Sequence, residues 1–345
     1  MRVAFDEQLA VGTATGIGEY AAGLAAALIR RANVDVIELR EPKLDPWRFD
    51  RRIVWDQGLL PWRARHARAD VLHCASGTMP WTCGIPVIVT VHDVAWLRVQ
   101  AHARAYARWY FGRFSLERYR HAAQIAVDSE FSRRELLEVC PQLDPARVAV
   151  VYPGVAADVC ALRRQPPDRT TILVVGTVER RKNLAALVRI LPQLDGARIV
   201  SVGPATPYRD ECAALATSLG VGERVEMRGY VARDELLGLY ARCAVVAVPS
   251  LYEGFGYAAA QAACAGIPSV VSDRGSLPEV AGRMTPVLSP DDGEAWTAAL
   301  QSALAGEYDA VASAARAAAI ERFSWDTAAQ SMEHLYARTA SRAAG

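Results

Sequence analysis

Short apolar runs alternate with longer stretches of helical composition along the whole chain. Each run is long enough for one strand and has apolar side chains on both faces, as a buried parallel strand does. The alternation of such strands with helices predicts an α/β fold with parallel sheets. The predicted strands span residues 2–6, 34–39, 69–73, 85–91, 124–128, 148–152, 170–175, 198–202, 225–229, 244–248 and 269–272.

The stretch PSLYEGFGYAAAQAACAG, residues 249–266, follows one of these strands and predicts a loop and a helix. The glycines beside Glu253 allow backbone to come close to a ligand, and the alanines after them favour a helix that ends at Gly266. The N–H groups at a helix start attract anions, and the Glu253 carboxylate accepts hydrogen bonds from sugar hydroxyls. The alternative is an ordinary turn with a glutamate on the surface.

Three cations follow the strand at 170–175, in the segment G-T-V-E-R-R-K-N at 176–183. Arg181 offers a planar fork of N–H donors and Lys182 a compact charge, and both match phosphate oxygens. Because the segment lies between the carboxyl end of a strand and a helix, we expect these cations to bind a diphosphate. A solvated run of surface charge is the alternative.

Two predicted strands of the first half end in histidine, one at His73 and one at His92, which Asp93 follows. Ligands of open parallel sheets bind at the carboxyl edge of the strands, so both histidines are candidates for a site there. The alternative is a histidine that packs in the core or lies on the surface. The position of His92 directly before an aspartate favours function, while His73 stays open between the two.

Three further segments have less regular patterns. Residues 41–68 are rich in Trp, Pro and Arg without a clean period, which predicts loops and a short helix. Residues 101–121 mix arginines with aromatic residues on a predicted helix, which would contact an anionic membrane surface or, alternatively, have a core face and a solvated face. The polar segment 163–169, with its two prolines, predicts a linker between domains.

Composition narrows the class of protein. The 345 residues, 52% of them hydrophobic, suffice for two domains, and a net charge of +1 gives no field that favours nucleic acid. The seven cysteines form no C-x-x-C pair, which is typical of reduced thiols in the cytosol. The sequence shows neither a signal peptide nor a run of about 18 apolar residues, so we expect a cytoplasmic protein.

Several motifs, in chain order, resemble those of the GT-B retaining glycosyltransferases of family 4. Glu253 matches the first of two glutamates that the family places eight residues apart, but the second position is Gln261 here. The other matching segments are G-I-G-E-Y at 16–20, V-T-V-H-D at 89–93, D-S-E-F-S-R-R-E-L-L at 128–137, G-T-V-E-R-R-K-N at 176–183 and F-S-W-D at 323–326.

The resemblance implies two Rossmann-like, doubly wound α/β domains that face each other across a cleft. We expect an acceptor domain at 1–162, the linker at 163–169, a nucleotide-sugar donor domain at 170–322, and a helix at 323–345 that returns to the first domain. The implied reaction moves a hexose from a nucleoside diphosphate sugar to a hydroxyl of a glycan or lipid-linked acceptor. It retains the anomeric configuration and needs no metal or other cofactor.

The residues that match the family's motifs carry the implied roles. Glu253, His92, Lys182 and Arg181 are the predicted catalytic residues. The predicted donor-binding residues are Gly16, Gly18, Thr177, Arg181, Lys182, Tyr230, Val231, Glu253, Gly254, Phe255, Gly256 and Gln261. The predicted acceptor-side residues are His73, Asp93 and Ser129.

The sugar, the acceptor and the effect of Gln261 are the open points. The resemblance favours mannose from a GDP-sugar, bacterial surface polysaccharide synthesis and peripheral contact with the inner membrane. Gln261 keeps an acceptor oxygen but lacks the glutamate's charge, so we expect weaker ribose binding, with Glu279 as a candidate substitute. A non-catalytic sugar-nucleotide-binding or scaffolding protein is the alternative function, and a sugar-nucleotide epimerase of similar fold is a third interpretation.

Overall fold

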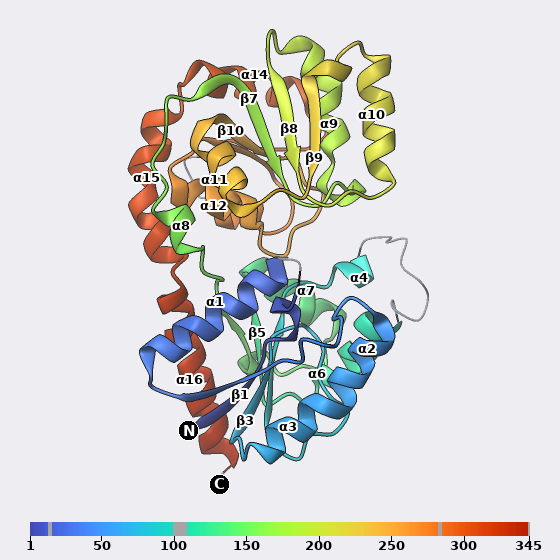
Figure 1. Cartoon of the computed structure of the whole chain (residues 1–345), viewed down its shortest axis with the longest axis vertical. Helices are drawn as coiled ribbons and strands as arrows, with labels where there is room; N and C mark the ends of the chain where they lie inside the picture. Colours follow the sequence, from blue (N-terminus) through green and yellow to red (C-terminus); the bar gives the residue numbers. More distant parts are fainter. Residues whose placement is uncertain (13–15, 99–108, 282–284, 344–345) are drawn as a thin grey trace. The chain divides into compact units, whose positions relative to one another are not determined.

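The chain folds into two compact units, each built around its own parallel sheet (Figure 1). The computed structural model describes residues 1–12, 16–98, 109–281 and 285–343. The first unit joins residues 1–154 to residues 323–345, and the second unit consists of residues 155–322. In the part of the chain that is described, each sheet has six strands, which confirms the predicted pair of α/β domains.

The sheet of the first unit has the strand order β2-β1-β3-β4-β5-β6, and neighbouring strands are parallel. Its strands are β1 (Arg2–Asp6), β2 (Asp35–Leu39), β3 (Val71–Cys74), β4 (Val87–Val91), β5 (Gln124–Val127) and β6 (Val148–Val150). The helices that accompany it are α1 (Gly16–Arg31), α2 (Phe49–Val54), α3 (Leu60–His66), α4 (Ala95–Arg98), α6 (Ser115–Tyr119), α7 (Glu130–Val139) and α16 (Trp325–Ala343).

Each face of this sheet has its own apolar core, because side chains alternate along a strand. On one face Phe5 packs with Leu24 of α1 and Met332 of α16, and Figure 1 shows these two helices side by side. On the other face Ala4 belongs to a core with Trp55 and residues of α3 and α7. The last helix therefore completes the first unit, as the sequence predicts.

The prediction of loops and a short helix at 41–68 underestimates the helix, because residues 49–66 form one nearly continuous helix. A π-helical turn at Trp55–Leu59 joins α2 to α3 directly before Pro61, which has no N–H to continue the regular pattern. The side chains that this helix buries include Arg52 and Asp56. Polar residues thus occupy part of its buried face, so the apolar period is hidden.

The predicted linker also lies elsewhere. Residues 163–169 belong to the second unit, and the chain passes between the units at 154/155 and at 322/323. Arg164 donates to Tyr240 O and Cys243 O at 3.1 and 2.9 Å, and Asp168 already begins a strand. A polar, proline-containing segment is therefore tied to its own unit by arginine and backbone contacts.

The sheet of the second unit has the order β12-β11-β10-β7-β8-β9, again with parallel neighbours. Its strands are β7 (Asp168–Val175), β8 (Arg198–Val202), β9 (Val225–Gly229), β10 (Cys243–Val248), β11 (Ser269–Ser272) and β12 (Val287–Leu288). Its helices are α8 (Ala157–Cys160), α9 (Leu184–Ile190), α10 (Tyr208–Ser218), α11 (Arg233–Arg242), α12 (Tyr257–Ala265), α13 (Leu277–Ala281), α14 (Gly293–Ala305) and α15 (Asp309–Arg322). This order is that of the Rossmann fold, and it reverses between β7 and β10.

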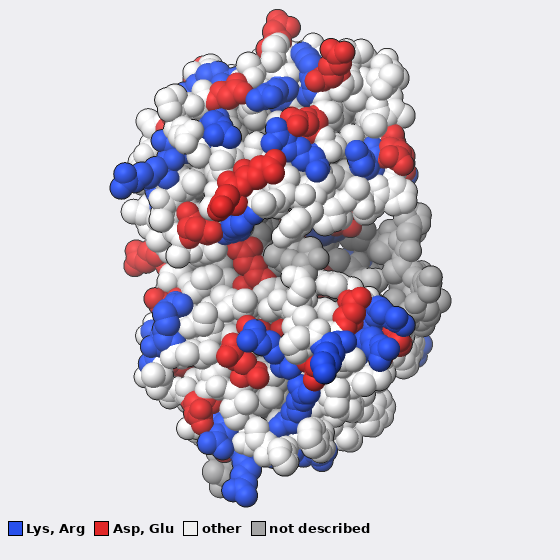
Figure 2. Space-filling view, viewed as in Figure 1, with Lys and Arg blue, Asp and Glu red and all other residues white. Residues whose placement is uncertain are grey.

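The visible face of each unit carries charges of both signs. Figure 2 shows lysine and arginine side chains mixed with aspartate and glutamate on the visible face of each unit. No helix among the described residues is long and apolar enough to cross a membrane. Of the predicted helix at 101–121, residues 101–108 lie outside the described residues, and Trp109–Phe114 forms a π-helical turn before α6.

Candidate active site

A glutamate and two cations meet where the strand order of the second sheet reverses. β7 and β10 are adjacent there, while their connections lead to opposite sides, which opens a crevice at the carboxyl edge. Lys182 follows β7 and Glu253 follows β10. The sequence places both residues after these strands, and the structure brings them into contact.

The loop that carries Glu253 is held by the segment after β11. The backbone N–H and the hydroxyl of Ser276 donate to Glu253 O at 3.1 and 3.2 Å. Gly275 has a φ of 65°, and a Cβ there would lie 2.4 Å from the same oxygen. Only glycine therefore fits this close approach.

The Glu253 carboxylate binds groups from two other segments. Lys182 Nζ donates to Oε1 at 2.5 Å, Arg181 Nη1 donates to Oε2 at 3.2 Å, and Ser250 Oγ donates to Oε1 at 2.8 Å. The carboxylate is buried, with its side chain 6% exposed. Burial favours the protonated form, but Lys182 and Arg181 outweigh it and lower the pKa of Glu253. Glu253 is therefore ionised at neutral pH.

The three adjacent cations do not share one role. Arg181 also donates to Glu179 at 2.7 Å and to Tyr252 O at 2.9 Å, which orients its guanidinium beside Glu253. Arg180 points away, because it pairs with Glu211 and its side chain is 63% exposed. The solvated-charge interpretation thus holds for Arg180, whereas Lys182 and Arg181 contribute to the site.

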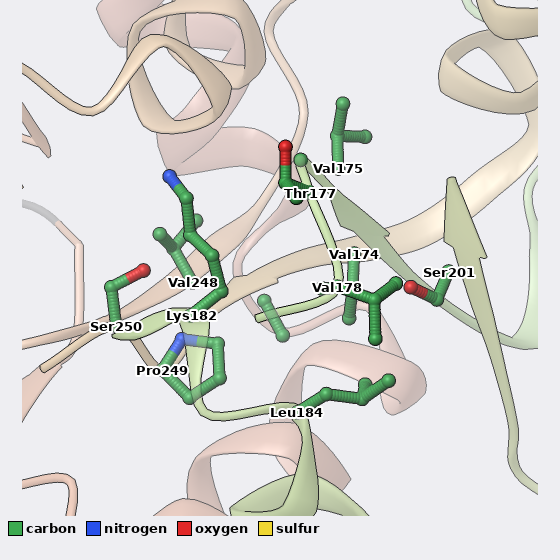
Figure 3. Close-up of a pocket in the computed structure, with 12 residues that line it drawn as sticks. Val174, Val175, Thr177, Val178, Lys182, Leu184, Ser201, Val248, Pro249 and Ser250 are labelled. Carbon is green, nitrogen blue, oxygen red and sulfur yellow. The ribbon is translucent and has the colours of Figure 1, made fainter. Parts of the chain in front are cut away.

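A narrow pocket lies beside Lys182. It is lined by the carboxyl end of β7, by Gly176 and Thr177 after it, by Val248 at the end of β10, and by Pro249 and Ser250 after β10. Figure 3 shows the Lys182 ammonium and the Thr177 hydroxyl directed the same way, away from Leu184 and Pro249. The carbonyl of Gly176 lies so close to Gly203 that a Cβ on Gly203 would stand 2.1 Å from it. This contact keeps the start of the cation segment against β8.

The helix after the glutamate loop has the predicted form. Gly254 and Phe255 are buried, and Gly256, with a φ of 90°, is the cap before α12. Gln261 lies within α12 and is 5% exposed. Its side-chain oxygen accepts a hydrogen bond from the Tyr240 hydroxyl at 2.8 Å. One lone pair of its oxygen is thus engaged within the protein. Tyr230 and Val231 follow β9 at the same edge, and Tyr230 is exposed.

His92 of the first unit is paired with a carboxylate. Its Nε2 lies 3.0 Å from Ala75 O, which can only accept, so Nε2 carries a proton. Its Nδ1 lies 2.7 Å from Asp128 Oδ2. Burial alone would lower the pKa of His92, but the Asp128 carboxylate outweighs it and raises the pKa. The sequence motif does not indicate Asp128 as the partner.

His73 is not at an open edge, which corrects the prediction of an acceptor-side role. It lies within β3, one residue before the strand ends, and is 0% exposed. Its Nδ1 lies 2.7 Å from the Tyr336 hydroxyl of α16, and its Nε2 lies 2.8 Å from Thr90 Oγ1. Burial lowers the pKa of His73 to about 3. His73 is therefore a neutral core residue beneath the last helix.

The other predicted residues of the first unit lie at element boundaries. Gly16 and Gly18 are in the first turn of α1, where Gly18 is buried. Asp93 Oδ1 accepts from Ala95 N at 2.9 Å. Ser129 is the cap of α7, accepts from Ser132 N at 2.9 Å and is 0% exposed. Asp93 and Ser129 thus bind backbone in this structure.

A buried charge cluster near the ends of β1 and β3 was missed by sequence reasoning. Arg52 Nε donates to Asp56 Oδ2 at 2.9 Å, and Thr78 and Tyr110 donate to the same oxygen at 2.7 and 2.8 Å. Asp6 accepts from Trp55 Nε1 at 2.9 Å. The i, i+4 spacing of Arg52 and Asp56 is the signal that could have indicated a helix there.

Comparison with known proteins agrees with this architecture. The family model for glycosyltransferase family 4 matches residues 14–159, and the model for glycosyl transferases group 1 matches residues 169–306. The solved structure of sucrose-phosphate synthase from Thermosynechococcus elongatus is similar with a TM-score of 0.77 at 22% identity, over 98% of both chains. The structure of Anabaena HepE in complex with UDP and glucose gives a TM-score of 0.72 at 17% identity, over 98% of this chain and 99% of that one.

Several relatives by sequence carry the same name. The D-inositol 3-phosphate glycosyltransferase of Mycobacterium marinum is 28% identical over 81% of this chain and 66% of its own length. The protein of that name from Xylanimonas cellulosilytica is 34% identical over 79% of this chain and 73% of its own length. The chain spans 53% to 66% of the length of three mycobacterial relatives of this name. By these matches and by its two sheets, the chain belongs to the group 1, or family 4, glycosyltransferases and has the GT-B fold.

Proposed function

We propose that this protein transfers a sugar from a nucleoside diphosphate sugar to a hydroxyl group. The observation that carries the proposal is the contact of Lys182 and Arg181 with Glu253 at the carboxyl edge of β7 and β10. It combines two cations that match a diphosphate with a carboxylate that accepts from sugar hydroxyls. The names of the relatives support the same reaction class.

The cations have two successive partners in the proposed mechanism. Before the donor binds, Glu253 holds Lys182 and Arg181 in place. The donor's diphosphate then accepts from the same N–H groups, and the sugar hydroxyls donate to the carboxylate oxygens that are released. As the bond to the sugar breaks, negative charge grows on the diphosphate, and the two cations stabilise it. Because the two cations stabilise this charge, the proposed transfer needs no metal.

Two further parts of the proposal rest on the first unit and on the family. By the family resemblance His92 stays a proposed catalytic residue; in this structure both of its ring nitrogens are bound within the first unit, Nε2 by Ala75 O and Nδ1 by Asp128. Retention at the anomeric carbon follows from the family resemblance.

The relatives favour a donor other than GDP-mannose and a role other than surface polysaccharide synthesis. Two proteins that share at least 30% identity over most of this chain are named for D-inositol 3-phosphate, and HepE was solved with UDP-glucose. We therefore propose a UDP-sugar as the first donor to test and a polyol phosphate as the first acceptor. A glycan or lipid-linked acceptor remains the second choice.

One experiment separates transfer from binding. The purified chain is incubated with UDP-glucose, UDP-N-acetylglucosamine or GDP-mannose, with and without D-inositol 3-phosphate, and release of the nucleoside diphosphate is measured. Release that the acceptor stimulates supports the proposal. Binding of a donor by calorimetry without release from any donor supports the non-catalytic alternative, for which Gln261 is the motivating residue. A protein that neither binds a donor nor releases the nucleoside diphosphate would overturn both the proposed transfer and the non-catalytic alternative.

A further inference from the structure

Two cysteines of the second unit lie against each other behind the glutamate loop. Cys160 is the last residue of α8, and Cys264 is the residue before the end of α12. α8 and α12 pack together. The two thiols lie close enough for each to shift the pKa of the other, and Cys160 Sγ also lies 3.8 Å from its hydrogen-bond acceptor, Val155 O. The seven cysteines all lie in the described part of the chain, and each is reduced in this structure.

A single arginine fixes the backbone of this pair. Arg316 of α15 donates from Nε to Cys264 O at 3.1 Å and from Nη2 to Cys160 O at 2.6 Å. Both nitrogens belong to one planar guanidinium, so the two cysteine carbonyls are held close together. A disulfide needs Cα atoms about 4.4–6.8 Å apart, and the packing of α8 on α12 together with the shared arginine brings the two backbone segments together.

The two thiols differ in access and in acidity. Cys264 is 0% exposed, whereas Cys160 is half-buried. The neighbouring Cys264 thiol and the nearby Arg316 charge lower the pKa of Cys160. The pKa of Cys264 is raised by the Cys160 thiol and by burial. The other five thiols have raised pKa values, mainly through burial. Of the seven cysteines, Cys160 is therefore the one that is both partly exposed and lowered in pKa, and the buried Cys264 is its neighbour.

We propose that Cys160 and Cys264 are a redox pair that closes to an intramolecular disulfide when the protein meets a peroxide. The Cys160 thiolate attacks one peroxide oxygen, the O–O bond breaks, and Cys160 becomes a sulfenic acid as the first water leaves. The Cys264 sulfur then attacks the Cys160 sulfur, the S–S bond forms, and the hydroxide leaves with the Cys264 proton as the second water. Two thiols are oxidised by two electrons, and a low-molecular-weight thiol reverses the bond by exchange.

The bond would act on the helix that begins at the glutamate loop. α12 starts directly after Gly256, and Cys264 lies near its other end. α8 begins three residues after Gly154, where the chain enters the second unit. The disulfide would therefore tie the entry segment of this unit to the helix that carries Gln261.

The first test counts thiols in the full chain. Reduced protein is treated with hydrogen peroxide at neutral pH, alkylated in denaturant, and weighed intact. We expect two of the seven thiols to escape alkylation, and a non-reducing peptide map to join the Cys160 and Cys264 peptides. Alkylation of all seven thiols, or a bond between Cys74 and Cys83, would overturn the proposal.

Variants test the order of the two steps. Cys160→Ser abolishes the bond and slows the peroxide-dependent loss of thiols at least tenfold, while Cys140→Ser, which removes a thiol of the first unit, oxidises like the wild type. Cys264→Ala leaves Cys160 as a sulfenic acid that dimedone traps, which a merely structural pair would not do. Circular dichroism confirms that each variant is folded. Absence of the trapped sulfenic acid in a folded Cys264→Ala protein would contradict the mechanism.

Discussion

The two sheets place polar residues at similar positions and use them in opposite ways. In the second unit, the residues after β7 and β10 meet at the crevice, where Glu253 holds Lys182 and Arg181. In the first unit, His73 is sealed beneath α16, and Arg52 with Asp56 is buried at 3% and 0% exposure. Arg181 and Lys182 each keep 21% of the side chain exposed, whereas His73 and the Arg52–Asp56 pair on the helix at 49–66 are almost fully buried. The following predictions test this contrast.

The largest effect is expected from the cations of the second unit. Lys182→Met removes a charge that touches the proposed donor site, so nucleoside diphosphate release should fall by about 10²–10³-fold with the fold intact. Arg180→Met is the matched control, because this neighbouring cation pairs with Glu211 on the surface. Its activity should stay within about twofold of the wild type. Equal losses of activity in both variants would contradict the assignment of Lys182 to the site and of Arg180 to the surface.

A stability effect is expected at His73. His73→Ala leaves a cavity and deprives Tyr336 and Thr90 of a hydrogen-bond partner, which should lower the free energy of unfolding by about 2–4 kcal/mol. Urea denaturation measures this difference. His121→Ala, at an exposed histidine of the same unit, should change it by less than about 0.5 kcal/mol. A His73→Ala protein with full stability but no transfer to acceptor would restore the acceptor-side role.

The two histidines of the first unit should have opposite pH dependences. The pKa of His73 is about 3 in the folded state, so below its unfolded value of 6.5 only the unfolded chain takes up the proton. Stability is lost as the pH falls, by about 2 kcal/mol at pH 5. The raised pKa of His92 stabilises the fold below pH 6.5, and this contribution is lost as the pH rises through the folded value.

Denaturation at several pH values separates these contributions. His73→Gln should flatten the acid side of the stability profile between pH 6.5 and 5, and His92→Gln should flatten the neutral to alkaline side. The same change on both sides in either variant would contradict the assignment of a neutral His73 and a charged His92.

The smallest effect is expected at Gln261. The Tyr240 hydroxyl donates equally well to a carboxylate, so Gln261→Glu should keep the helix and should keep or raise donor affinity, by a factor of about five at most. Calorimetric titration with UDP measures this affinity, with Tyr240→Phe as the control for the loss of the hydroxyl. A collapse of donor binding in Gln261→Glu would show that the neutral amide is required.

The strands and the second-unit site were accessible from sequence, because each rests on local pattern. The apolar runs, the glycine loop at Glu253 and the cations after β7 need no knowledge of distant segments. The fate of His73 depends on Tyr336, which lies 263 residues further along the chain. The helix at 49–66 was hidden because Arg52 and Asp56 occupy its buried face. The boundary at 154/155 was not predicted, because the contacts by which Arg164 ties residues 163–169 to the second unit cannot be inferred from the composition of that segment.

The discontinuous first unit has a consequence for the order of folding. The second unit is one continuous segment, whereas the first needs residues 323–345, which the ribosome makes after the whole second unit. At about 5–20 residues per second, the intervening segment takes roughly 10–30 s to emerge. During this interval the apolar face around Phe5 and Leu24 lacks its covering helix. Nascent chains stalled before residue 323 should therefore recruit chaperones to their amino-terminal half.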